Sequence, residues 1–221
     1  MLFHKDYNRP LRFALAFVIS IVITAPVIGK SQYLQFIDIS LTGDVQKHET
    51  AFLHVWYTLV SFFGSPKTGI LWTLLIAFLL WGFKYKIQAL WAMGAVYGGD
   101  VIDEIIKNLV KRPRPALHPA ADTSYSFPSG HVFSTFLIIS VLWFVAVPMI
   151  KRAKLRWLVY VLCVVWVGMV VLARIYLNAH YPTDTLGALA IAYTWLQICE
   201  WLYIVIGPRL KRWRLTQHSY L

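Results

Sequence analysis

The segment ARIYLNAHYPTD at residues 173–184 places three polar side chains directly after a long apolar run. His180 and Asp184 are four residues apart, so they would share one face of a helix. A carboxylate that accepts a hydrogen bond from one imidazole nitrogen leaves the other nitrogen free as a base or nucleophile. Arg174 adds a cation nearby. The pattern predicts catalysis by His180, and a simple polar contact at a helix start is the structural alternative.

A second segment, KNLVKRPRP at residues 107–115, is rich in cations: Lys107, Lys111, Arg112 and Arg114. Pro113 and Pro115 push the residue before each of them into an extended conformation, which would aim the two arginines. One guanidinium group can bind two phosphate oxygens at once, and a lysine adds a compact positive charge. The segment indicates a phosphate site. Contact of these side chains with lipid headgroups is the alternative.

The third segment is FPSGHVFSTFLI at residues 127–138. A helix is expected to begin near His131, and the free N–H groups at a helix start bind anions. Gly130 would let a ligand approach the backbone closely. Ser129 would contact the same ligand, although a simple N-cap is its structural alternative.

Taken together, the three segments predict a phosphoryl group that is held by cations, attacked by one histidine and released with help from another. A metal site built from the histidines and Asp184 is disfavoured, because the surrounding cations would repel a divalent ion. We therefore expect neither a metal nor another cofactor.

The composition indicates an integral membrane protein. Hydrophobic residues make up 58% of the 221 residues, the mean hydropathy is +0.59 and only 14% of residues are charged, against about 25% in soluble domains. The net charge of +11 is more typical of basic cytoplasmic loops than of nucleic-acid binding. Cys163 and Cys199 lie in apolar runs and are expected to be buried thiols. The first apolar segment lacks a small-residue cleavage site, which favours a retained helix over a signal peptide.

We predict a single all-α membrane domain over residues 1–221. Six segments are apolar and long enough to span the membrane: 13–29, 68–83, 87–106, 132–150, 157–173 and 185–207. Residues 51–64 are too short for a span and are expected to form an interfacial or re-entrant helix.

The distribution of basic residues predicts the orientation of these spans. With six spans, 13 of the 21 Lys and Arg fall on the side that also holds both termini. The positive-inside rule places that side in the cytoplasm. The loops 107–131 and 174–184 then lie together on the outer face, because two spans separate them.

These residues resemble the type 2 phosphatidic acid phosphatase superfamily, which includes vanadium haloperoxidases. Its K-x(6)-R-P pattern is met by Lys107, Arg114 and Pro115, its P-S-G-H pattern by residues 128–131, and its S-R-x(5)-H-x(3)-D pattern by Arg174, His180 and Asp184. Ala173 stands where the family has Ser, and we expect a modest effect because no charge or nucleophile is lost.

The resemblance implies a role for each residue. His180 would form a phosphohistidine, Asp184 would orient it, and His131 would protonate the leaving oxygen. The phosphate oxygens would be held by Lys107, Arg114, Arg174, Ser129 and Gly130. From its i,i+3 spacing alone, Glu104 is expected to steer Lys107.

The resemblance also implies a membrane lipid substrate. Undecaprenyl pyrophosphate is the first expectation, because the resemblance implies its release on the outer face, and phosphatidylglycerophosphate or phosphatidic acid is the alternative. Two other classes stay open: an intramembrane serine protease built on Ser129, and a non-enzymatic anion-binding or flippase module.

Overall fold

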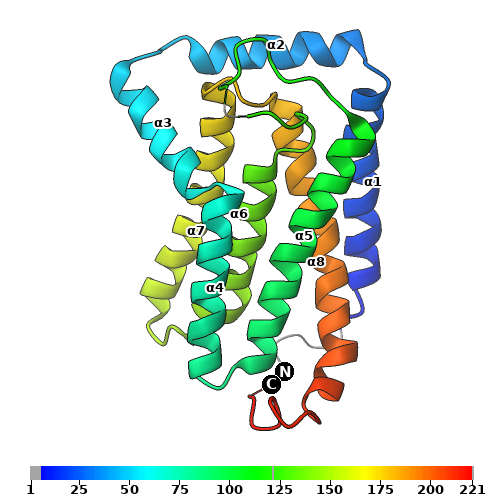
Figure 1. The fold of residues 1–221 in the computed structure, drawn as a ribbon, viewed down its shortest axis with the longest axis vertical. Coiled ribbons are helices and arrows are strands. Elements are labelled where there is room, and N and C mark those ends of the chain that lie inside the picture. Colours follow the sequence, from blue (N-terminus) through cyan, green and yellow to red (C-terminus); the bar gives the residue numbers. More distant parts are fainter. Residues whose placement is uncertain (1–5, 121, 221) are drawn as a thin grey trace.

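The computed structural model describes residues 6–120 and 122–220, and all regular structure within them is helical. The α-helices are α1 (Arg9–Ile28), α2 (Gln32–Gln46), α3 (Ala51–Phe63), α4 (Pro66–Gly82), α5 (Lys86–Val110), α6 (Gly130–Val141), α7 (Ala153–Tyr176) and α8 (Pro182–Leu210). Short π and 3-10 turns, Leu142–Ala146 and Val147–Met149, prolong α6. Figure 1 shows the long helices upright in one bundle, with α2 across one end and both termini near the other.

All six segments predicted to span the membrane are helical. By length and apolarity, α1, α6 with its continuation, α7 and α8 can each cross a membrane, and α3 and α4, bent by 51°, can form one further span together. Helix α5 is long enough at 25 residues, but Asp100, Asp103 and Glu104 interrupt its apolar character. An all-helical protein with several membrane-capable helices is confirmed, whereas the count of six and the interfacial position of residues 51–64 stay predictions.

Helix α2 was not predicted. Its sequence, QYLQFIDISLTGDVQ, alternates polar and apolar residues too often to show as a membrane segment. Ser31 caps its start by accepting a hydrogen bond from the backbone N–H of Leu34. The inward face carries Asp38 and Thr42, both buried, one helical turn apart. The helix therefore presents polar groups to the end of the bundle that it covers.

The core lies where α5, α6 and α8 pack against one another. Small residues allow this close approach: a Cβ atom at Gly99 would overlap the side chain of Leu137. Cys163 and Cys199 are both buried and free, as predicted. The rigid contact between α5 and α6 fixes the end of one helix against the start of the other, where two of the motif segments lie.

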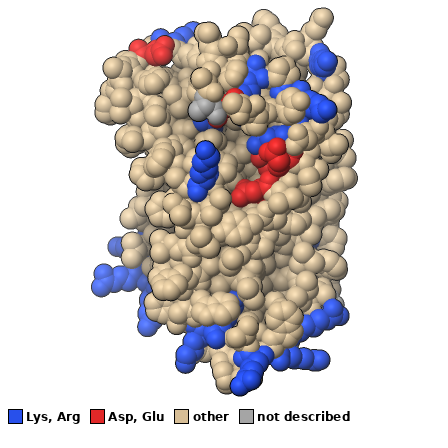
Figure 2. Space-filling model, in the orientation of Figure 1, with Lys and Arg blue, Asp and Glu red and all other residues tan. Residues whose placement is uncertain are grey.

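The two ends of the bundle differ in charge and in content. The C-terminal segment meets the turn between α4 and α5, where Lys86 Nζ donates to the Leu215 carbonyl at 2.9 Å. Basic side chains gather at this end of the visible face (Figure 2), below a belt of uncharged surface. The loops that follow α5 and α7 lie together at the other end (Figure 1). The shared end of the motif loops is thus confirmed, and the side of the membrane that it faces stays a prediction.

Candidate active site

The structure brings all the predicted site residues together at the end of the bundle covered by α2. Each comes from the tip of an element: Lys107 from the last turn of α5, Arg114 from the following loop, Ser129, Gly130 and His131 from the start of α6, Arg174 from the last turn of α7, His180 from the next loop and Asp184 from the first turn of α8. Helix ends that converge in this way can place backbone N–H groups and charged side chains around one ligand.

The contacts of His180 define its tautomer. Its Nδ1 atom lies 2.7 Å from the carbonyl oxygen of Ser126, and its Nε2 atom lies 3.1 Å from the Arg114 guanidinium. A carbonyl only accepts hydrogen bonds and a guanidinium only donates them. Nδ1 therefore carries the proton, and the lone pair of Nε2 faces the cations. This is the arrangement that a nucleophilic imidazole requires.

The protonation state of His180 follows from its surroundings. Burial lowers the pKa of the imidazole well below its ordinary value of 6.5, and the nearby charges of Arg174, Arg114 and Lys107 lower it further. The carboxylate of Asp122 opposes these effects without cancelling them. His180 is consequently neutral at pH 7, with an unprotonated Nε2.

Asp184 supports His180 less directly than its spacing suggested. Its carboxylate oxygen lies 3.7 Å from His180 Nδ1, whereas the Ser126 carbonyl is the direct acceptor. The carboxylate itself accepts hydrogen bonds from the Ser126 hydroxyl, from the Tyr181 backbone N–H at 2.9 Å and from Arg112 at 2.5 Å. The expected direct hydrogen bond between His180 and Asp184 is therefore not formed. Ser126 bridges the two residues instead, with its carbonyl group on His180 and its hydroxyl group on Asp184.

Arg114 and Arg174 point to a common centre that an acidic side chain occupies. Arg174 donates to the carboxylate of Asp122 at 2.6 Å, and Arg114 lies 3.6 Å from the same oxygen. Ser61 of α3 and Ser124 hold the two guanidinium groups in place from the other side. The two guanidinium groups therefore both face one carboxylate, and guanidinium groups of this kind can also bind phosphate oxygens.

Lys107 completes the group of cations. It pairs with Asp103, four residues earlier, and both side chains are buried. The expectation that Glu104 steers Lys107 is wrong, since Glu104 instead accepts a hydrogen bond from Asn108 at 2.9 Å. A Cβ atom at Gly130 would lie 2.7 Å from the Lys107 ammonium, so the glycine makes room for it.

The start of α6 supplies the neutral donors. Ser129 occupies the N-cap position, yet its side chain makes no capping hydrogen bond. Among the described residues its buried hydroxyl has no partner, which leaves it available to a ligand. His131 stands in the first turn and interacts electrostatically with His180 and with all three site cations. Both residues therefore belong to the same group as the cations.

Sequence reasoning missed Ser61 and Ser124, which hold the two arginines, and four further residues of this site. The sequence gives the least indication of a site role for Asp38, because this residue lies in a helix that was not predicted. Ser126 acts through its backbone as well as its hydroxyl, which no motif can reveal. Asp122 lies in a loop without any pattern. Asp103 did carry a signal, the i,i+4 spacing to Lys107, which is as favourable as the spacing of Glu104.

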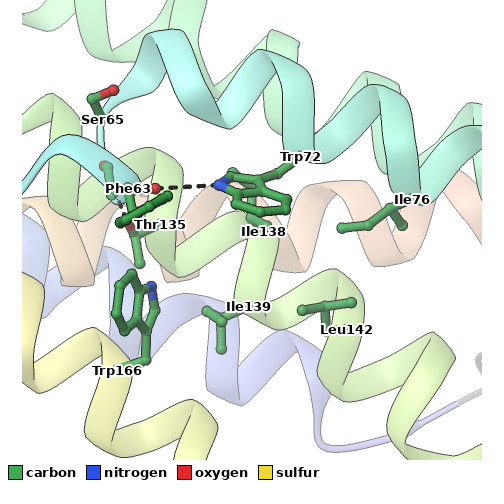
Figure 3. Close-up of a pocket in the computed structure, with 10 residues that line it drawn as sticks. Phe63, Ser65, Trp72, Ile76, Thr135, Ile138, Ile139, Leu142 and Trp166 are labelled. Carbon is green, nitrogen blue, oxygen red and sulfur yellow. Dashed lines mark hydrogen bonds between the residues drawn. The ribbon is translucent and has the colours of Figure 1, made fainter. Parts of the chain in front are cut away.

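An apolar groove of about 510 Å³ runs beside the site, between α4, α6 and α7. Figure 3 shows Trp72, Ile139 and Trp166 along its walls. At the end of the groove near Phe63 and Ser65, the Thr135 hydroxyl donates to the Gly64 carbonyl at 3.1 Å, in the break between α3 and α4. Ser61, three residues before Gly64, holds Arg174. The groove thus offers apolar surface at the break between α3 and α4, and Arg174 contacts the last part of α3 through Ser61.

Comparison with known proteins shows which family this architecture defines. The model of the PAP2 superfamily matches residues 87–206, more than half of the chain. The chain belongs to the PAP2 superfamily. This confirms the resemblance drawn from the three motifs.

Individual relatives agree with this assignment. Phosphatidylglycerophosphatase B of Bacillus subtilis (strain 168) is 30% identical over 99 residues, an alignment that covers 43% of this chain and 49% of that protein. The chain thus matches about half the length of this curated relative. The crystal structure of the first transmembrane PAP2 type phosphatidylglycerolphosphate phosphatase from Bacillus subtilis superposes with a TM-score of 0.77 at 19% identity, covering 92% of this chain and 99% of that one. Aquifex aeolicus LpxE gives 0.55 at 19% identity, with 76% and 95% covered. The two structures establish a shared fold.

Proposed function

We propose that this protein is a lipid phosphate phosphatase that works through a phosphohistidine on His180. The observation that carries the proposal is the orientation of His180, whose Nε2 lone pair faces Arg114 while Ser126 holds Nδ1–H. A phosphate seated between Arg114 and Arg174 would present its phosphorus to that lone pair. Membership of the PAP2 superfamily and the 30% identity to a phosphatidylglycerophosphatase support this reaction class.

The reaction would proceed in two balanced steps. In the first step Nε2 of the neutral His180 forms a bond to phosphorus while the bond to the lipid oxygen breaks. His131, which this scheme requires to be protonated at the start, gives that oxygen its proton and becomes neutral. In the second step a water gives its proton to His131 and attacks phosphorus, which breaks the nitrogen–phosphorus bond. Inorganic phosphate leaves, and both histidines return to their starting states.

The developing negative charge would be stabilised by the cations and the neutral donors of the site. In this proposal Lys107, Arg114 and Arg174 would surround the transferred phosphoryl group, and the Ser129 hydroxyl and the N–H groups in the first turn of α6 would donate hydrogen bonds to it. Three cations supply the electrostatic stabilisation that a divalent metal provides in other phosphatases. We therefore propose a metal-independent reaction.

The substrate we propose is a membrane lipid that carries a phosphate at headgroup level. The apolar groove beside Gly64 supports this choice, because it could accept a hydrocarbon chain while the phosphate reaches Arg174. The relationship to phosphatidylglycerophosphatase B favours phosphatidylglycerophosphate. Undecaprenyl pyrophosphate, the first expectation from the sequence, is kept as the second candidate because the basic residues predict an outward-facing site.

The test is release of inorganic phosphate from each of the two lipids by purified protein in EDTA. We expect release by the wild type and none by His180→Ala, whereas His48→Ala, which changes an exposed histidine outside the site, should stay active. The ratio of kcat/KM for the two lipids then decides between the candidates. Absence of release from both lipids would contradict the proposal, and abolition by EDTA would contradict its metal-independent form.

The two other classes make different predictions. A serine protease needs a histidine within hydrogen-bond reach of its serine, and the Ser129 hydroxyl contacts none among the described residues. Peptidase activity that survives replacement of Lys107, Arg114 and Arg174 would favour that class. A flippase or anion-binding module would keep its function in His180→Ala, since the cations remain.

A further inference from the structure

Asp38 of α2 is an acidic residue that is fully buried at the edge of the site, although it lies outside the three motifs and outside residues 87–206. One carboxylate oxygen accepts a hydrogen bond from the Thr183 backbone N–H at 3.0 Å. The other accepts from the Thr183 hydroxyl and from Arg112, both at 2.6 Å. A buried charge with such complete partners is built into the structure, because an unpaired one would be strongly destabilising.

Arg112 connects Asp38 to the catalytic group. One guanidinium nitrogen contacts Asp38, and the other contacts Asp184 at 2.5 Å and the Thr183 hydroxyl at 2.8 Å. The guanidinium also lies over the ring of Tyr181, 4.3 Å from its centre. A planar fork held at both ends in this way is rigid. Arg112 is therefore committed to two carboxylates and is not a phosphate ligand.

The charges of this group matter for His180. Arg112 and Asp184 alone would cancel, so that Asp184 would act on the imidazole only as part of a neutral pair. Asp38 adds a second negative charge, which gives the group Asp38–Arg112–Asp184 a net charge of −1. When Nε2 attacks phosphorus, the ring keeps its Nδ1 proton and becomes positive. A net negative group beside Nδ1 stabilises that positive ring against the three cations on its other side.

We propose that Asp38 is a positioning residue for catalysis: it holds Arg112, and through Arg112 the carboxylate of Asp184, beside His180, and it supplies the excess negative charge of that group. The inference rests on the proposed phosphohistidine reaction. It assigns a part in that reaction to α2, a helix that contributes nothing to the motifs.

The charged and titratable groups near His180 are Lys107 of α5, Arg112, Arg114 and Asp122 of the following loop, His131 of α6, Arg174 of α7, Asp184 of α8 and, through Arg112, Asp38 of α2. Of these, Asp38 can be neutralised without touching the anion site. Asn at this position keeps the size of the side chain and can still accept from Thr183.

The experiment compares Asp38→Asn with Asp44→Asn on the same helix. Asp44 is exposed, and its ion-pair partner among the described residues is Lys47, at 2.5 Å. For Asp38→Asn we expect kcat to fall about tenfold to a hundredfold, as for a misplaced reactive group, with KM unchanged. The acid limb of kcat/KM should move to lower pH, because the loss of a negative charge lowers the pKa of the imidazole. Asp44→Asn should match the wild type in all three quantities.

A second variant guards against a folding defect. Arg112→Lys keeps the positive charge but cannot bridge both carboxylates, so it should also lower kcat with little change in KM. The role of Asp38 would be overturned if the wild type is active and a folded Asp38→Asn variant has the same kcat. It would also be overturned if the substitution changes KM alone. A wild type that releases no phosphate would instead overturn the proposed function itself.

Discussion

The carboxylate of Asp122 accepts a hydrogen bond from Arg174 at 2.6 Å, so it occupies the position at which we propose that the substrate phosphate binds. The same oxygen is 3.6 Å from Arg114. In the proposed reaction the substrate would have to displace Asp122 from both arginines before its phosphate could reach them. The free site is less strongly cationic than its three positive side chains suggest.

Asp122→Asn should consequently bind phosphate more tightly. We expect KM, and the inhibition constant of inorganic phosphate, to fall about fivefold, which corresponds to ~1 kcal/mol for one charged hydrogen bond. The value of kcat should change little, because Asp122 has no part in the proposed bond-making and bond-breaking steps. Asp44→Asn controls for the change in overall charge. Weaker phosphate inhibition in Asp122→Asn would show that Asp122 positions the arginines instead of competing with the ligand.

The activity should persist to lower pH than a free histidine would permit. The nucleophile must be unprotonated, and burial together with three cations lowers the pKa of His180 well below 6.5. As the pH falls, the free enzyme loses activity only when the imidazole finally takes up a proton. The acid limb of kcat/KM, which reports the free enzyme, should therefore lie below pH 6.5.

The phosphate of the substrate also titrates, with a second pKa of about 6 in monoesters. The measurement should therefore use two substrates whose phosphate pKa values differ. A limb that both substrates share belongs to the enzyme. A shared limb at or above pH 6.5 would contradict the environment described for His180.

Gly130→Ala should remove activity without unfolding the protein. The added Cβ atom would lie 2.7 Å from the Lys107 ammonium and 2.9 Å from Asp103, so this buried ion pair must shift. Displacement of a site cation by about 1 Å can cost roughly a hundredfold in rate. Gly94→Ala in α5 is the matched control, since no atom of the described part of the chain lies within 4 Å of its added Cβ. Equal kcat/KM values for the two variants would show that the Lys107 position is not critical.

The candidate site residues, which the structure brings together, could be selected from the sequence because each belongs to a local spacing pattern at a helix end. The patterns around Lys107, Ser129 and His180 each hold within one turn or loop. Their convergence could also be predicted, since an even number of spans separates the loops. The six helical segments could be predicted for the same reason, because each membrane helix can be identified from the length of its own apolar stretch.

The remaining features depend on contacts between distant segments. Asp38 and Arg112 are 74 residues apart, and nothing in the surrounding sequence marks Asp38 as buried. Ser126 supports His180 through a carbonyl oxygen, which every residue type possesses. Glu104 and Asp103 were equally plausible partners of Lys107 by spacing, and only the packing of α5 against α6 decides which one faces inward.

The groove beside the site yields a prediction that separates the lipid chain from the phosphate. Ile139 points into the groove, between Trp166 and Leu142 (Figure 3). Ile139→Trp would fill part of its volume of about 510 Å³. If a hydrocarbon chain lies there, KM for a long-chain lipid phosphate should rise several-fold, because apolar contact worth ~0.8 kcal/mol per buried methylene is lost. A soluble phosphate monoester, which has no chain to place, should keep its kcat/KM.

Leu158→Trp on the exposed face of α7 is the control for a new membrane-facing tryptophan. Equal losses on both substrates would mean that the substitution distorts the anion site, and no loss on either would exclude the groove as the path of the lipid chain.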